Sequence, residues 1–208
     1  MQAIAQFING LTRKVPAWPL YILLALPGIA VFVGEIMNPS ADPVEELEHE
    51  LGEFAIQLLV VGMLVTPVRD LLGVNLIKYR RAIGVMAFVY VLAHFLVYLL
   101  LDAQLDWAVI WKDLSQRTYI IVGFISFLIL IPLAATSNNW ALRKMGPVRW
   151  RRLHYFVYPA VILGAVHYVM LEKVWDEEAL MYLAIMIVLV GYRFWPKGVW
   201  PKRTRARA

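Results

Sequence analysis

The chain has 208 residues, of which 61% are hydrophobic, a net charge of +5 and a mean hydropathy of +0.64. Because soluble domains are about 45–50% apolar, this composition excludes an ordinary water-soluble domain and indicates an integral membrane protein. The sequence has no cysteine, which excludes disulfides, iron–sulfur clusters and thiolate metal sites, and it has no nucleotide-binding G-x-G-x-x-G or P-loop motif.

Six apolar stretches follow one another along the chain. The first follows Arg13 and Lys14 as a secretory signal would, but no small-residue cleavage site closes it, so we interpret it as an uncleaved helix. The second is short and is expected to stand upright or to thin the bilayer. Since about 20 residues cross a bilayer as a helix, we predict an all-α integral membrane protein, a six-transmembrane-helix bundle in one domain over residues 1–208. The stretches cover about 18–37, 53–68, 82–101, 118–135, 154–171 and 179–195.

The basic residues indicate the orientation of these spans. If both termini lie on one side, that side holds every Lys and Arg except Lys112, Arg117 and Lys173. Positive residues mark the cytoplasmic side of a membrane protein, so we predict cytoplasmic N- and C-termini. The basic tail after residue 195 is then expected to contact anionic lipid, and we predict no nucleic-acid partner.

Three of the four histidines lie in the predicted spans or at their edge: His94, His154 and His167. An ionisable side chain within a span is costly and is a functional hypothesis by default. His94 follows Arg81 by thirteen residues and His167 follows Arg152 by fifteen, which places them about 20 and 22 Å above the cytoplasmic face at about 1.5 Å per residue. Two imidazoles at matching depth on parallel helices suit the axial positions of a haem iron. His154 lies at the cytoplasmic edge.

Two alternatives stay open for these histidines. They could form hydrogen bonds between helices, as polar residues in membranes often do, or they could relay protons in a small transporter. A mononuclear metal site is disfavoured, because no carboxylate is predicted at the same depth. Thirteen residues leave His154 and His167 about 140° apart on an ideal helix, so Pro159 between them is expected to kink the helix or shift its phase.

A cluster of basic residues is predicted at the cytoplasmic face beside His154. Such residues could bind haem propionates or a flavin phosphate through charge-assisted hydrogen bonds. The orientation of the spans requires basic residues on this side in any case. The cluster consists of Arg80, Arg81, Lys144, Arg149, Arg151 and Arg152.

At these residues the chain resembles a known family. The segments "ADPV", "TP", "RRAIG", "LAHF" and "LHYFVY" followed by "HY" are similar in order and spacing to the MsrQ (YedZ) family over roughly residues 40–172. The resemblance implies a haem b subunit of a methionine sulfoxide reductase system in the inner membrane of Gram-negative bacteria, within the wider ferric-reductase-like membrane domain. It also implies a flavin, FMN, and it places the family's haem-ligand histidines on His94, His154 and His167.

The resemblance also implies a function and partners. We expect a membrane subunit that passes electrons from a cytoplasmic NAD(P)H flavin reductase to a periplasmic molybdopterin-containing methionine sulfoxide reductase, where the substrate is reduced. The haem-binding core is expected at about 78–172. Relatives in the wider superfamily have two histidines on each ligand helix, whereas this chain has Arg80 or Arg81 where a partner of His154 would lie, so one or two haems are expected. The alternatives are a quinol-oxidising cytochrome b subunit and a small proton-coupled transporter.

Overall fold

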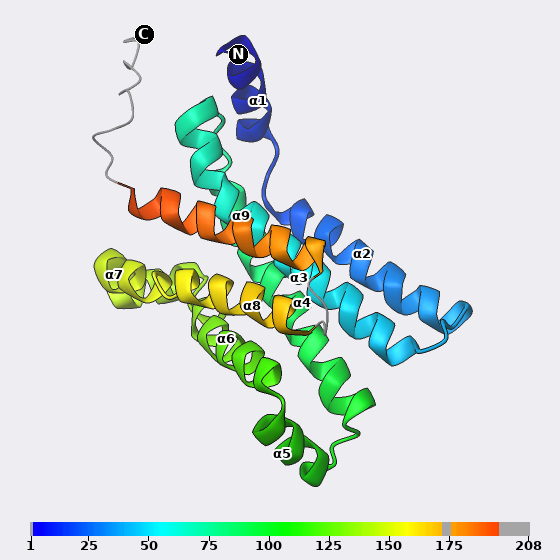
Figure 1. The fold of residues 1–208 in the computed structure, drawn as a ribbon. Coiled ribbons are helices and arrows are strands. Elements are labelled where there is room, and N and C mark those ends of the chain that lie inside the picture. Colours follow the sequence, from blue (N-terminus) through cyan, green and yellow to red (C-terminus); the bar gives the residue numbers. More distant parts are fainter. Residues whose placement is uncertain (1, 172–175, 196–208) are drawn as a thin grey trace.

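The structure is a computed structural model that describes residues 2–171 and 176–195. Every regular element within these residues is helical, which confirms the all-α prediction (Figure 1). The α-helices are α1 (Gln2–Lys14), α2 (Trp18–Met37), α3 (Pro43–Pro67), α4 (Arg80–Val97), α5 (Trp107–Gln116), α6 (Thr118–Ala135), α7 (Asn139–His154), α8 (Val157–Leu171) and α9 (Glu177–Phe194). Short η segments continue α3 (η1, Val68–Leu72), precede α4 (η2, Ile77–Tyr79) and extend it (η3, Tyr98–Asp102).

Five helical segments of the described chain are long and apolar enough to cross a membrane. The sixth predicted stretch forms α9, but charges at both ends, Glu177, Glu178 and Arg193, leave only residues 179–192 uncharged. That length covers about 21 Å, less than the roughly 30 Å of bilayer hydrocarbon. The sixth span and the sidedness of the termini therefore stay predictions, and the basic tail 196–208 lies outside the described residues. The five segments are Trp18–Met37, Pro43–Leu72, Ile77–Asp102, Thr118–Ala135 and Asn139–Leu171.

The second span is longer than the predicted stretch 53–68, because α3 already begins at Pro43, in an acidic segment. Asp42 Oδ1 accepts a hydrogen bond of 3.1 Å from the backbone N–H of Glu45, and Pro43 occupies the first turn. Both features favour a helix start. The extra turns carry Glu48 and Gly52 into the bundle.

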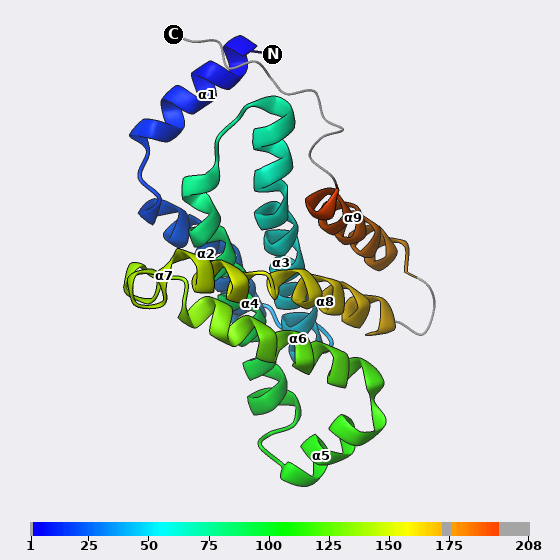
Figure 2. The ribbon, with the colours of Figure 1, turned by 90° about the vertical axis from the view of Figure 1, so that its left-hand side faces the viewer.

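Helix α3 is the central element of the bundle, with α4 packed against it on one side and α8 and α9 on another. Figures 1 and 2 show α3 and α4 running antiparallel, with α6 beside α8. We call the end at which α3 ends and α4 begins the inner end, and the opposite end the outer end. The two largest core clusters join α3 to α4 through Leu51 and Tyr90, and α3 to α8 and α9 through Val60, Val161 and Met186.

A side chain of α4 forms hydrogen bonds with the backbone of α2. The Tyr90 hydroxyl accepts from the Gly28 N–H at 2.9 Å and donates to the Leu24 carbonyl at 2.7 Å, so it bridges backbone groups one turn apart. A β-carbon on Gly28 would lie 2.8 Å from the Tyr90 ring, which is why a glycine is required there. Insertion of a side chain into a helical hydrogen-bond ladder also distorts a helix, and Pro27 lies at the same place.

The predicted fifth helix is interrupted, which resolves the phase of its two histidines. Residues Tyr155 and Phe156 separate α7 from α8, so His154 and His167 lie on different helices. The ring of Pro159 in the first turn of α8 excludes a regular helical carbonyl four residues before it, at Tyr155. The expectation that Pro159 disturbs the helix is therefore confirmed, as a break rather than a kink.

Candidate functional site

His94 on α4 and His167 on α8 face each other in the outer half of the bundle. Their ring centroids are 6.2 Å apart and their planes are inclined by 74°. Both side chains are partly buried. The structure thus brings together the two histidines that were paired by depth alone.

Each ring is oriented by a backbone carbonyl of a neighbouring helix. His94 Nδ1 lies 2.7 Å from the carbonyl oxygen of Glu48 on α3, and His167 Nδ1 lies 2.8 Å from that of Tyr119 on α6. A carbonyl can only accept, so these contacts assign the proton of each ring to Nδ1. Nε2 of both rings is therefore unprotonated and is the nitrogen able to bind a metal.

A glycine one turn after each accepting carbonyl makes room for the ring. Gly52 follows Glu48 by four residues, and a β-carbon there would lie 3.4 Å from His94 Nδ1. Gly123 follows Tyr119 by four residues, and a β-carbon there would lie 2.7 Å from His167 Nδ1. We call these two sites the glycine notches. They let the imidazoles approach the helix backbone closely enough to reach a carbonyl.

The spacing of the two rings fits a metal held between them. Two metal–nitrogen bonds of about 2 Å, with about 1.1 Å from each nitrogen to its ring centre, require centres about 6 Å apart. No group of three His, Asp or Glu side chains within residues 2–171 and 176–195 could hold a metal ion. Two axial nitrogens without further protein ligands fit an iron whose remaining positions are filled by a porphyrin.

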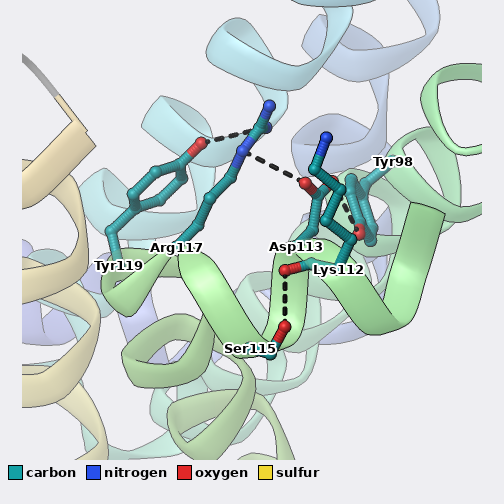
Figure 3. Close-up of polar contacts among 6 residues, drawn as sticks. All are labelled: Tyr98, Lys112, Asp113, Ser115, Arg117 and Tyr119. Atoms are coloured by element: carbon teal, nitrogen blue, oxygen red, sulfur yellow. Dashed lines mark hydrogen bonds and ion pairs between the residues drawn. The ribbon is translucent and has the colours of Figure 1, made fainter. Parts of the chain in front are cut away.

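A polar network at the outer end reaches the residue that orients His167 (Figure 3). Arg117 pairs with Asp113 at 3.1 Å through Nε, and its Nη1 donates to the Tyr119 hydroxyl at 3.4 Å. Tyr98 donates to the other carboxylate oxygen of Asp113 at 3.4 Å. Burial acts to lower the pKa of Arg117, but Tyr119 and Asp113 together raise it above its usual value. The cation therefore persists and links η3, α5 and the start of α6.

His154 lies apart from this pair, at a cavity near the inner end. The cavity has a volume of about 1250 Å³. The His154 ring stacks on Trp150 with centroids 3.8 Å apart, and its Nε2 lies 3.1 Å from the Thr136 hydroxyl. His154 would have to release this hydrogen bond to bind a metal through Nε2.

The predicted basic cluster is divided by the structure. Arg80, Arg81 and Arg151 line the cavity, together with Arg69 and Arg193, which the sequence did not single out. Arg193 donates to the Tyr158 hydroxyl at 2.7 Å. By contrast, Lys144, Arg149 and Arg152 are not among the lining residues, and the Lys144 ammonium lies over the Trp140 ring at 4.7 Å.

The sequence did not predict the accepting carbonyls or the glycine notches. Gly52 and Gly123 are ordinary helix-packing residues in sequence, since small residues are common in membrane helices. Only the pairing of α3 with α4 and of α6 with α8 reveals which glycine meets which histidine. The sequence holds one signal for the notches. In each neighbouring span, a glycine follows a residue near the outer end by four positions.

Comparison with known proteins gives the family. The ferric reductase like transmembrane component family matches residues 51–165. A protein of Agrobacterium fabrum named "Protein-methionine-sulfoxide reductase heme-binding subunit MsrQ" is 44% identical over 199 residues, 94% of this chain and 92% of the relative. Relatives with the same name from Brucella anthropi and Brucella ovis are 41% and 44% identical, over 93% and 85% of this chain and 89% and 80% of their own lengths. The chain therefore belongs to the MsrQ family, whose members are haem-binding subunits of protein-methionine-sulfoxide reductases with a ferric-reductase-like membrane domain.

Proposed function

We propose that this chain carries electrons across a bacterial inner membrane through haem b, with His94 and His167 as axial ligands of the outer haem. The observation that carries the proposal is the 6.2 Å spacing of the two rings, which matches two imidazoles on one iron. Haem b supplies a one-electron ferric/ferrous couple when it is bound. The substrate-reducing active site is expected on the partner.

The chain's own residues orient and tune the ligands. The Glu48 and Tyr119 carbonyls hold the two Nδ1–H groups, which fixes ring orientation and raises the basicity of Nε2. A more basic axial ligand stabilises the more highly charged ferric iron and lowers the reduction potential. The surrounding apolar helices exclude water from the ligands.

The inner cavity is the proposed place of a second cofactor, either a second haem b with His154 as a ligand or FMN. Its volume of about 1250 Å³ is sufficient, since ligand pockets usually measure about 300–1,000 Å³. Arg80, Arg81 and Arg151 at its wall are suited to propionates or to a flavin phosphate through charge-assisted hydrogen bonds.

The path of the electrons follows from this arrangement. With six spans and cytoplasmic termini, the arginine-lined cavity faces the cytoplasm and receives electrons from an NAD(P)H flavin reductase. The His94–His167 level faces the periplasm and delivers them to a molybdopterin-containing methionine sulfoxide reductase. The excess of Lys and Arg on the inner side supports this orientation.

The test is the haem content and spectrum of the purified chain and of three alanine variants. His94→Ala and His167→Ala should each remove the Soret absorbance and the bis-imidazole signal of the outer haem. His49→Ala is the matched control, because His49 is exposed at the outer end and its variant should keep the spectrum. A purified chain without Soret absorbance after expression with ample haem, or ligand variants with unchanged spectra, would refute the proposal.

A further inference from the structure

Helix α5 is too short to cross a membrane, and it connects two segments that are long enough to do so. It joins two spanning segments, Ile77–Asp102 and Thr118–Ala135, at the same end of the bundle. Its ten residues extend about 15 Å, about half the hydrocarbon thickness of a bilayer. Figure 2 shows α5 at the bottom of the view, at the outer end, between α4 and α6.

One face of α5 is apolar, and the protein covers only half of it. The apolar residues recur at the i, i+3, i+4, i+7 spacing of an amphipathic helix: Trp107, Ile110, Trp111 and Leu114. Ile110 and Leu114 are partly buried, whereas Trp107 and Trp111 are 77% and 74% exposed. The exposed polar residues Lys112 and Gln116 lie outside this stripe.

The orientation of α5 about its axis is fixed from the protein side. Asp113 is only 6% exposed and is held by Arg117 and Tyr98. Asp106 caps the helix by accepting from the Ala108 N–H at 2.8 Å. Because the buried Asp113 side chain faces the protein and contacts Tyr98 on η3, the two tryptophans keep their outward direction and need an environment other than bulk water.

We propose that α5 is an interfacial anchor that lies in the plane of the outer bilayer boundary, with Trp107 and Trp111 in the lipid headgroup region. Tryptophan concentrates at this level of a membrane, where the apolar ring and the polar N–H are both satisfied. An amphipathic helix of this kind buries its apolar face at the boundary between headgroups and acyl chains. In this position the exposed half of the stripe would adjoin the lipid that surrounds the two flanking spans, and Lys112 and Gln116 would face water.

The absence of cysteine from the sequence makes a direct test possible in the full-length haem-loaded chain. Single-cysteine variants Trp107→Cys and Trp111→Cys are compared with Lys112→Cys and Gln116→Cys on the polar face, all in lipid nanodiscs. A charged, membrane-impermeant maleimide should react about tenfold more slowly at 107 and 111, because an apolar environment disfavours the thiolate. A neutral maleimide that partitions into lipid should label all four sites. The Soret spectrum of each variant verifies that it has folded.

A second measurement uses the native tryptophans. In nanodiscs that contain lipids brominated near the headgroup, the emission of the chain should be quenched, and the double variant Trp107→Phe/Trp111→Phe should lose part of the quenched fraction. Fast reaction of the charged maleimide at 107 and 111, together with an unchanged quenched fraction in the double variant, would overturn the proposal. The exposed stripe would then be free for a water-soluble partner.

Discussion

Gly123 and His167 are in such close contact that a β-carbon on Gly123 would lie 2.7 Å from Nδ1 of the imidazole. The equivalent distance from Gly52 to His94 Nδ1 is 3.4 Å, an ordinary van der Waals separation. In both glycine notches a glycine lies against a histidine ring, but only the notch at Gly52 has room for a β-carbon. Substitution of Gly123 by alanine is therefore expected to have the larger effect.

Gly123→Ala is expected to displace the His167 ring from the Tyr119 carbonyl and to weaken binding of the outer haem. Loss of an orienting hydrogen bond to a metal ligand typically costs about 10–100-fold in affinity. Gly52→Ala should keep most of its haem, since its β-carbon fits. The measurement is haem retention per chain during dilution, together with the bis-imidazole electron paramagnetic resonance signal.

Gly164→Ala is the matched control for these substitutions. Gly164 lies on α8, three residues before His167, and its β-carbon would meet only the Ser126 hydroxyl, at 3.5 Å. The variant should bind haem as the parent does. Equal haem loss in the Gly123 and Gly164 variants would mean that α8 packing, and not the notch, sets the affinity.

Arg117→Met is expected to destabilise the outer end more than Asp113→Asn does. Removing the arginine leaves a buried carboxylate without its cation, which costs about 1–3 kcal/mol. Replacing the carboxylate by an amide leaves a half-exposed arginine in water and should cost less than about 1 kcal/mol. The two variants are compared by the Tm at which the outer haem is released. The reverse order would show that the pair does not support Tyr119.

His154→Ala should reduce the content of the inner cofactor without changing the outer haem. His154 lies on α7, is separated from α8 by a helix break, and contacts Trp150 and Thr136. Pyridine haemochrome and flavin counts per chain measure the inner loss, and the bis-imidazole signal reports the outer pair. Thr136→Val is the companion variant, because it removes the hydrogen bond to Nε2 while it keeps the histidine. Loss of the bis-imidazole signal in His154→Ala would contradict the proposal that the inner cofactor site and the outer haem site are separate.

The division of the basic cluster gives a paired prediction for the inner cavity. Arg80→Ala combined with Arg81→Ala should weaken cofactor binding by roughly tenfold or more, since each charge-assisted hydrogen bond contributes about 1.5–3 kcal/mol. Arg149→Ala combined with Arg152→Ala removes the same charge from the same side, but those residues do not line the cavity. The second pair should retain the parental cofactor content. Similar losses in both pairs would indicate a general effect of charge.

The pairing of His94 with His167 could be predicted from the sequence, because depth in a membrane follows from counting residues from a charged boundary. The helical character and five of the spanning segments could be predicted as well, because a run of about 20 apolar residues is long enough to cross a bilayer only as a helix. The start of α3 was missed, since its acidic first turns carry no hydropathy signal and depend on the Asp42 cap and Pro43. The glycine notches and the division of the basic cluster depend on which helices are neighbours, and a single sequence does not record that.

The contact of Tyr90 with the backbone of α2 has a consequence for how the protein is made. The hydroxyl that bridges Leu24 and Gly28 belongs to a residue more than sixty positions later in the chain. Helix α2 emerges from the ribosome before α4, and most of its surface stays exposed in the finished bundle. Its final docking therefore has to wait until α4 has been inserted, so the order of synthesis makes α2 a late-joining helix in spite of its early place in the sequence.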